Sequence, residues 1–152
     1  MDKKINFLHT CRKAAAEAEK LFGINARIIL AQGALESGWG SSCLATEHHN
    51  FFGLMGYGAS NAYWHGQRAT FETAYGTHHF RHYEATRLSF LDFARLIRSA
   101  YPRAYHFSFQ PEAYAKSPTA NTSAKSTATT VPPIKRCWSR FAEKSVNSFP
   151  TP

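Results

Sequence analysis

The sequence predicts an α+β fold that is mainly α, with a helical body and one small β-hairpin lobe. Apolar residues recur at helical spacing over residues 5–22 and 88–97, and the run ARIILAQGAL between them is apolar almost all round. Two short segments of alternating polarity, 68–73 and 78–83, predict the hairpin. With 152 residues, 43% of them hydrophobic, the chain can bury one core.

The first two helices have clear boundaries in the sequence. The first is expected over residues 2–22 and ends at Gly23, because glycine tolerates the left-handed conformation that often follows a helix. Asn25 is a suitable N-cap for the second helix, over residues 26–35. Because this second helix is apolar nearly all round, we expect it to be the buried central helix.

The rest of the chain divides into three parts. Residues 43–83 are rich in Gly, Asn, His and aromatic residues, which predicts an irregular lobe that holds the hairpin. Helical spacing returns over 88–97, and Pro102 is expected to end that helix. Apolar residues then become sparse, so we predict a domain over residues 1–115 and a poorly ordered tail over 116–152.

Charge and hydropathy restrict the partners and the location. A net charge of +8 suits an anionic polymer such as nucleic acid or a cell wall, with a merely solubilising surface as the alternative. No basic run alternates with aromatics as in a nucleic-acid groove, so we expect no nucleic-acid partner. No apolar run is long enough for membrane insertion, and no signal peptide is visible at the N-terminus.

The cysteines and histidines predict no metal and no other cofactor. Cys11, Cys43 and Cys137 lack CxxC spacing, and buried free thiols are favoured over a bond between the first two. The adjacent histidines at 48–49 and 78–79 point apart on any regular element. The GxSxG pattern of many serine hydrolases is absent.

Glu36 is the strongest candidate for a catalytic group. It lies in the last turn of the apolar second helix and precedes Ser-Gly-Trp-Gly. Apolar surroundings and the negative end of the helix dipole both favour the protonated carboxyl, as in a general acid. The alternative is an exposed glutamate at a helix end, but this position normally favours Lys or Arg. The glycines that follow would also allow a polymer to approach closely.

The segment around Glu36 carries a family resemblance. AQGALESGWGSSCLATEHHNFFGLMGY resembles the signature of glycoside hydrolase family 73, the bacterial endo-β-N-acetylglucosaminidases of the autolysin and flagellar-hydrolase type. The resemblance covers about residues 10 to 115. Its further matches are Trp64 and Gly66, Thr70 and Glu72, FRHY at 80–83, SFLD at 89–92 and PRAY at 102–105.

The resemblance implies a lysozyme-like fold whose helical body and β-hairpin lobe flank a glycan-binding cleft. It implies hydrolysis of the bond between N-acetylglucosamine and N-acetylmuramic acid in peptidoglycan, with Glu36 as the general acid. Glu72 matches a second, less uniform acidic position of the family, and a solvated strand carboxylate is the alternative. If the acetamido group of the substrate attacks the anomeric carbon, a second carboxylate need only assist.

The same resemblance implies a set of substrate-binding residues. Asn50, Phe51, Phe52 and Gly53 would form the floor of the cleft. Aromatic rings could stack on sugar faces, although packing in the core is an equal explanation for Trp39. The predicted aromatic contacts are Tyr57, Trp64, Tyr83, Tyr105 and Trp39.

The sequence also departs from the family pattern. Met55 replaces a lysine that is usual in the family, and the YISE-x-GDNR-type segment near the C-terminus is absent. One hypothesis is a change of reading frame, because a shift of residues 121–134 back by one nucleotide permits YISEKYGDNRPAY. Resequencing the gene or weighing the intact protein would test it.

Several functional alternatives stay open. A muramidase or a lytic transglycosylase on the same fold would cut the other glycan bond, and a non-catalytic peptidoglycan-binding module would cut none. Action in the periplasm or cell wall without a signal peptide would require a secretion system, phage lysis or a flagellar-type route. A secreted effector would have an immunity or inhibitor protein as a partner.

Overall fold

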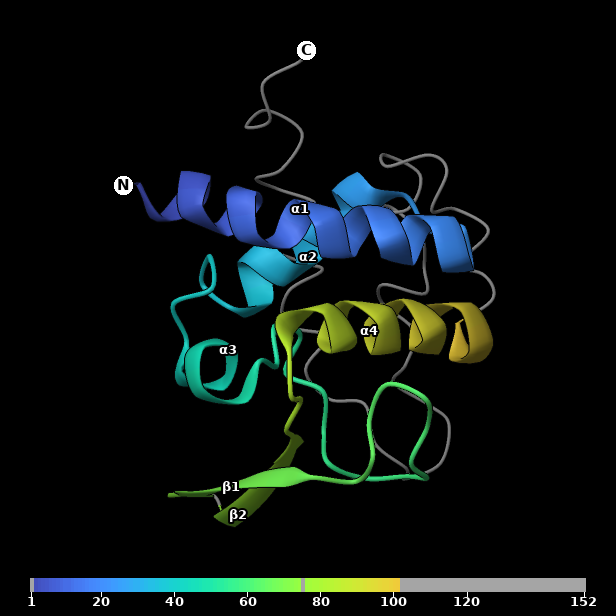
Figure 1. Ribbon diagram of the computed structural model, residues 1–152. Coiled ribbons are helices and arrows are strands. Elements are labelled where there is room, and N and C mark those ends of the chain that lie inside the picture. The colour runs from blue at the N-terminus through green and yellow to red at the C-terminus, as the bar shows by residue number, and fades with distance from the viewer. Residues whose placement is uncertain (1, 75, 102–152) are drawn as a thin grey trace.

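The computed structural model describes residues 2–74 and 76–101 (Figure 1). Tyr105, Cys137, the predicted domain boundary at 115 and the predicted tail lie outside the described residues. The elements in chain order are α1 (Lys3–Phe22), α2 (Ala26–Glu36), α3 (Cys43–His48), β1 (Arg68–Thr73), β2 (Gly76–Arg81) and α4 (Thr86–Ala100).

The ends of α1 and α2 follow from local side-chain and backbone chemistry. The Asp2 carboxylate accepts a hydrogen bond from the Lys4 amide at 3.0 Å, and the Asn25 side chain accepts one from the Arg27 amide at 2.9 Å. Gly23 adopts a left-handed conformation at φ 71° and ends α1. The predicted N-cap at Asn25 and the predicted end at Gly23 are therefore confirmed.

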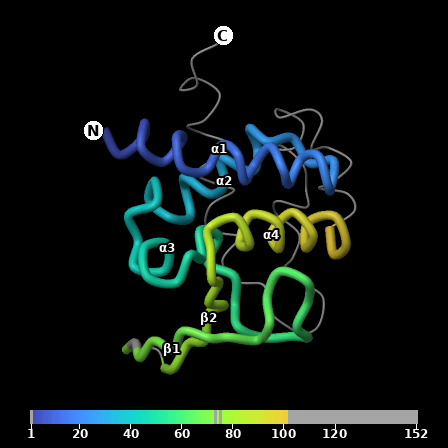
Figure 2. Tube along the Cα trace, in the orientation of Figure 1, coloured from blue at the N-terminus to red at the C-terminus, as the bar shows by residue number. Residues whose placement is uncertain are grey.

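Helices α1, α2 and α4 form the helical body. Helices α1 and α4 run side by side, and α2 packs against them (Figures 1 and 2). The buried face of α1 is lined by small residues, Ala14, Ala15 and Ala18, which let the neighbouring helices approach closely. Large apolar side chains of α2 and α4 fill the core between them, among them Ile28, Ile29, Phe90, Leu91 and Phe93. The predicted burial of α2 is confirmed for Ile28, Ile29 and residues 31–34.

Strands β1 and β2 form the predicted antiparallel hairpin, which projects from the helical body on the side away from α1 (Figure 1). Its register pairs Arg68 with Arg81 at one end and Thr73 with Gly76 at the other. The second strand thus begins at Gly76, before the predicted His78. Ala69 and Arg81 are the buried residues among the described side chains of the hairpin, so little apolar packing holds it.

Two expectations for residues 43–83 need correction. Cys43–His48 form the short helix α3 rather than irregular chain, with the Ser42 hydroxyl accepting a hydrogen bond from the Ala45 amide. Both Cys11 and Cys43 are free, but only Cys11 is buried, and burial raises the pKa of its thiol to about 12. The prediction of a buried thiol was wrong for Cys43.

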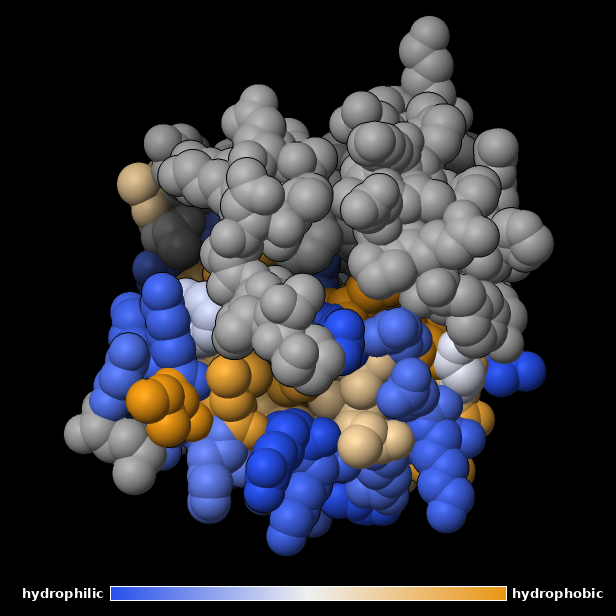
Figure 3. Space-filling model, turned by 90° about the horizontal axis from the view of Figure 1, so that it is seen from above, coloured by the Kyte–Doolittle hydropathy of each residue, from blue (hydrophilic) through white to orange (hydrophobic). Residues whose placement is uncertain are grey.

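The surface of the described chain combines charged and apolar side chains. No helix in residues 2–74 and 76–101 is both long and apolar enough to cross a membrane. On the face seen in Figure 3, hydrophobic side chains lie among hydrophilic ones. The exposed large hydrophobic residues are Ile5, Leu8 and Leu21 on α1, Leu35 on α2, and Tyr57.

Candidate active site

Glu36 is the last residue of α2, and its side chain is only partly exposed. The Gln32 side chain, one turn earlier and almost completely buried, donates a hydrogen bond from Nε2 to Oε1 of Glu36 at 2.9 Å. Residues four apart lie on the same face of a helix, so this contact is built into α2 itself. A buried amide thus fixes the direction of the candidate carboxyl group.

The turn after Glu36 depends on three consecutive left-handed residues. Gly38, Trp39 and Gly40 have φ angles of 58°, 63° and 76°. The buried Ser37 hydroxyl donates to the Gly33 carbonyl at 2.5 Å and accepts from the Gly40 amide at 2.7 Å. These bonds close the turn immediately after the candidate acid.

The two glycines of this turn have different surroundings. A Cβ atom at Gly40 would lie 3.2 Å from a ring carbon of Phe51. The space beside Gly40 is therefore already occupied by the Phe51 side chain. The expected approach of a polymer therefore has no support at Gly40. A Cβ atom at Gly38 would have Ser41 Oγ at 3.3 Å as its one neighbour within 4 Å, so Gly38 lies at a more open point.

A second glycine-dependent contact fixes α2 against the core. A Cβ atom at Gly33 would lie 3.4 Å from the ring tips of both Phe52 and Phe90. Phe52 in turn stacks on Phe93 of α4, with ring centroids 4.0 Å apart and planes 5° apart. The ring of Phe52 is therefore a packing element between α2 and α4, and its burial favours this role over the predicted place on a cleft floor.

Asn50 organises the loop that follows α3. Its Nδ2 donates to the carbonyl oxygens of Leu54 and Arg81 at 3.0 and 2.9 Å, and its Oδ1 accepts from the Leu54 amide at 3.1 Å. All of these partners belong to the backbone, and Asn50 is buried. Asn50 thus connects the loop to the end of β2, while Gly53 turns the chain at φ 61°. The geometry gives both residues a structural part in this loop.

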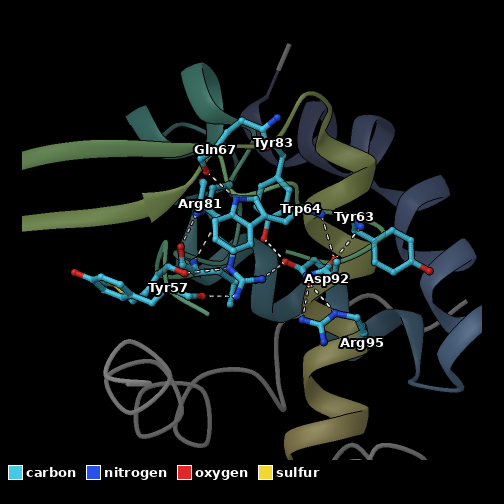
Figure 4. A network of polar contacts seen from close by, with 12 residues as sticks. Tyr57, Tyr63, Trp64, Gln67, Arg81, Tyr83, Asp92 and Arg95 are labelled. Atoms are coloured by element: carbon cyan, nitrogen blue, oxygen red, sulfur yellow. Dashed lines mark hydrogen bonds and ion pairs between the residues drawn. The ribbon is translucent and has the colours of Figure 1, made fainter. Parts of the chain in front are cut away.

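Asp92 is the centre of a buried polar network that joins the lobe to α4 (Figure 4). One carboxylate oxygen accepts from Arg81 Nη1 at 2.5 Å and from the Tyr83 hydroxyl at 2.7 Å. The other accepts from Asn61 Nδ2 at 3.1 Å and from Arg95 Nε at 2.9 Å. This fully buried carboxylate is therefore compensated by two cations and two neutral donors.

Arg81 extends this network into the loop before the hairpin. Its Nε and Nη2 donate to the carbonyl oxygens of Met55 and Tyr57, both at 3.0 Å. Its guanidinium group lies over the ring of Trp64, 4.2 Å from the ring centroid. A single arginine thus holds the loop and the sheet against α4.

Trp64 and Tyr83 face this network and are almost completely buried. Trp64 Nε1 donates to the Gln67 carbonyl at 2.7 Å, and the Tyr83 hydroxyl donates to Asp92. Burial, followed by the neighbouring charge of Asp92, raises the pKa of Tyr83, so its hydroxyl stays a donor. Their burial favours packing over the predicted stacking on sugars. Tyr57, about 40% exposed, presents its ring at the surface.

Glu72 lies on β1 with an exposed side chain. Both of its carboxylate oxygens accept from the hydroxyl of Thr77, its cross-strand partner, at 3.0 and 2.9 Å. This contact orients the carboxylate on the hairpin. A role in catalysis stays a prediction for Glu72, as it does for Glu36.

Sequence reasoning missed two features, the contact of Gln32 with Glu36 and the Arg81–Asp92 network that joins the lobe to α4. The position of Gln32, four residues before Glu36 on a nearly apolar helix, was a usable signal for a buried partner. Arg81 and Asp92 both lie in segments that match the family, FRHY and SFLD. Their contact joins different elements and therefore has no periodic signal in the sequence.

Comparison with known protein families identifies the family to which the chain belongs. The model of the glucosaminidase family, described as mannosyl-glycoprotein endo-beta-N-acetylglucosaminidase, matches residues 12–133. Because this match spans most of the chain, the protein belongs to that family, glycoside hydrolase family 73. The resemblance to glycoside hydrolase family 73 found in the sequence is therefore confirmed. The boundary predicted at residue 115 stays a prediction, and the family match continues beyond it.

Curated relatives match a shorter part of the chain. Two proteins named "Putative endo-beta-N-acetylglucosaminidase", from the TIGR4 and R6 strains of Streptococcus pneumoniae, are each 51% identical over 41 residues. This segment is 27% of the present chain and 6% of each relative. The chain thus spans only a small part of the length of these relatives.

Solved structures show the same fold. The glycoside hydrolase domain of Salmonella typhimurium FlgJ aligns with a TM-score of 0.64 at 24% identity, over 95% of this chain and 88% of that one. The catalytic domain of the Listeria monocytogenes autolysin Auto gives 0.62 at 21%, over 94% and 86%. A peptidoglycan hydrolase of Sphingomonas sp. A1 gives 0.62 at 23%, over 93% and 88%. The predicted lysozyme-like fold class is confirmed.

Proposed function

We propose that this chain is an endo-β-N-acetylglucosaminidase that hydrolyses the β-1,4 bond between N-acetylglucosamine and N-acetylmuramic acid in peptidoglycan. The observation that carries the proposal is Glu36. In a chain of the glucosaminidase family, it stands at the end of the largely buried helix α2 with its carboxyl group oriented by Gln32. General acid catalysis needs such a fixed proton donor beside the bond that breaks.

Glu36 acts in the reaction by donating its proton to the glycosidic oxygen as the bond from that oxygen to the anomeric carbon breaks. The bonding electrons leave with the oxygen, and the anomeric carbon develops the positive charge of an oxocarbenium-like transition state. Water then supplies the new hydroxyl group, and its second proton restores the acid. Either Glu72 or the acetamido oxygen of the substrate stabilises the anomeric carbon from the other side.

Three observations support the proposed bond and its substrate class. The family description, mannosyl-glycoprotein endo-beta-N-acetylglucosaminidase, supports cleavage of an internal N-acetylglucosaminide bond and does not itself name peptidoglycan. Structures of similar fold include the glycoside hydrolase domain of FlgJ, the catalytic domain of an autolysin and a peptidoglycan hydrolase. The net charge of +8 favours association with the carboxylate groups of a cell wall.

Analysis of the sugar at the new reducing end tests the reaction. Purified peptidoglycan is digested, the products are reduced with borohydride, and mass spectrometry identifies the reduced sugar. We expect reduced N-acetylglucosamine. Reduced N-acetylmuramic acid would instead show a muramidase, and a 1,6-anhydro product would show a lytic transglycosylase. Binding to the wall without any released product would show a non-catalytic binding module.

We further propose that the protein acts in the periplasm or cell wall. Its substrate class lies there, and the candidate routes of delivery include a secretion system, phage lysis and a flagellar-type route. An exported toxin requires a cognate immunity or inhibitor protein in the producing cell. The genes beside this one would distinguish these routes, because an adjacent immunity gene accompanies only the first.

A further inference from the structure

Three side chains that metal ions commonly bind lie together on α3, outside the candidate active site. Cys43, Glu47 and His48 each offer one ligand atom, and these three atoms lie within 4.8 Å of one another. Cys43 and Glu47 are four residues apart and therefore share one face of the helix. The group combines a sulfur, a carboxylate oxygen and an imidazole nitrogen.

This donor set favours zinc over harder cations. Thiolate sulfur and imidazole nitrogen are soft or borderline ligands, whereas Mg²⁺ and Ca²⁺ prefer sites made of oxygen atoms. Zinc bonds of about 2.0–2.3 Å in tetrahedral geometry put neighbouring ligand atoms roughly 3.3–3.8 Å apart. Because Cys43 and Glu47 are exposed, small side-chain rotations can close the group from its present spread.

His82 orients His48 from a distant part of the chain. The Nδ1 atoms of the two rings are hydrogen-bonded at 3.1 Å, and the Tyr83 amide donates to the His48 carbonyl at 3.0 Å. The ring of His48 also meets the ring of Phe71 edge to face, with centroids 5.8 Å apart. With Nδ1 engaged by His82, the nitrogen left for an ion is Nε2. Metal-binding histidines usually have such a partner on the second ring nitrogen.

The neighbouring His49 does not share this arrangement. Its Nδ1 lies 3.5 Å from the hydroxyl of Thr86 at the start of α4. Two adjacent histidines thus point to different partners, as the sequence predicted. The sequence predicted no metal site, because Cys43 lacks CxxC spacing and the histidine pairs were judged separately; the grouping of Cys43 with Glu47 and His48 is visible only in the structure.

We propose that Cys43, Glu47 and His48 bind a zinc ion, with His82 as the residue that positions His48. Three protein ligands leave the fourth tetrahedral position for water or a small solute. The ion would connect the two ends of α3, the helix that follows the turn after Glu36. The proposal concerns a binding site only and does not depend on the proposed glycan hydrolysis.

Metal binding by the reduced, purified chain tests the proposal directly. Zn²⁺ is titrated against a chromophoric chelator, and Co²⁺ is then substituted to reveal sulfur ligation through the thiolate-to-cobalt charge-transfer band. We expect one Zn²⁺ per chain and a clear band. Cys43→Ala should remove the band, and Cys43→Ala and His48→Ala should both abolish tight binding. His49→Ala and Glu84→Gln, which alter exposed or partly exposed neighbours, are the matched controls and should bind as the wild type does.

His82→Ala separates positioning from ligation. Loss of an outer partner typically costs about 10–100-fold in metal affinity, so Zn²⁺ should bind more weakly while the cobalt band remains. Unchanged affinity would overturn the positioning role of His82. Wild-type affinity in Cys43→Ala, or an equal loss in His49→Ala, would overturn the site itself. Circular dichroism of each variant shows whether its fold is retained.

Discussion

The helical body and the lobe, defined as residues 55–82, are held by different forces. In the body, Phe52 stacks on Phe93 and meets Phe90 edge to face, which forms an aromatic cluster between α2 and α4. In the lobe, Ala69 and Arg81 are the buried residues among the described side chains of the hairpin, and the buried polar contacts converge on Arg81. Apolar burial therefore stabilises the part that carries Glu36, whereas charge-assisted hydrogen bonds hold the part that carries Glu72.

This difference implies that the two candidate carboxyl groups can be disturbed separately. Apolar packing is non-directional and tolerates small adjustments, but a network around one buried carboxylate fails when a single partner is removed. Damage to the body should unfold the whole described domain. Damage to the network should loosen the lobe while α2 keeps Glu36 in place.

The largest effect is expected from Phe90→Ala in the body. Phe90 is fully buried and contacts Phe51, Phe52 and the helix of Glu36 at Gly33. Removing a buried phenylalanine ring typically costs about 3–5 kcal/mol, so we expect a loss of that order in the free energy of unfolding. Urea denaturation measures it, with Leu21→Ala on the exposed face of α1 as the control. A loss below 1 kcal/mol would contradict the account of the body.

Arg81→Lys should give the next largest effect, confined to the lobe. Lysine keeps the charge near Asp92 but cannot also reach the Met55 and Tyr57 carbonyls in a planar fork. We expect a cost of about 2–4 kcal/mol, on the basis of hydrogen bonds to charged groups.

Hydrogen exchange shows where this cost falls. The Gly56 amide, bonded to the His79 carbonyl, should lose protection, whereas amides of α2 should keep theirs. Arg68→Lys changes the exposed cross-strand partner of Arg81 and should have no such effect. Equal loss of protection in α2 and the lobe would show that the two regions are one cooperative unit.

Glu72→Gln should affect catalysis while leaving binding to peptidoglycan intact. If Glu72 positions water or stabilises the transition state, kcat should fall by about tenfold, which equals 1.4 kcal/mol. This drop in kcat is much smaller than the one expected for Glu36→Gln. A difference of this kind favours a mechanism in which the acetamido group of the substrate attacks the anomeric carbon. Steady-state kinetics on purified peptidoglycan measures it. An unchanged kcat would return Glu72 to the role of a solvated strand carboxylate bonded to Thr77.

The smallest effect concerns the exposed pair of Glu17 on α1 and Arg87 on α4. The hydrogen bonds from Arg87 lower the pKa of Glu17, although partial burial opposes them. Because the pKa of Glu17 is lower in the folded state than in the unfolded state, the ion pair stabilises the protein at pH values above the unfolded-state pKa. This contribution is lost as the pH falls through the folded-state pKa of Glu17. Wild type should therefore exceed Glu17→Gln slightly in stability at neutral pH and match it in acid. If the stability advantage of wild type over Glu17→Gln increased at acid pH, the lowered pKa of Glu17 would be contradicted.

Local chemistry explains which parts of the fold the sequence predicted well. Asn25 and Gly23 mark helix ends through contacts with residues nearby in the chain, and alternating polarity marked the hairpin. Helix α3 was missed because six residues make fewer than two turns, too few for a periodic pattern. The αL conformation of His49, which ends α3, also has no strong sequence signal.

The candidate site was only partly predictable for a similar reason. Glu36 stood out because a carboxyl group is unusual on an apolar helix, and its place at the end of α2 is as expected. The buried contacts of these aromatic residues come from other elements, since Tyr83 bonds to Asp92 of α4 and Trp64 lies against Arg81 of β2. Aromatic residues suit both sugars and cores, so only their three-dimensional contacts could distinguish these roles.

The activity of Glu36→Gln on purified peptidoglycan tests the central claim most directly. Glutamine keeps the size of the side chain and an oxygen to accept the bond from Gln32, but it cannot donate the acid proton. General acid catalysis is typically worth about 10²–10⁴-fold, so we predict a loss of that order with an unchanged melting temperature. Near-normal turnover by Glu36→Gln would contradict the assignment of Glu36 as the catalytic acid.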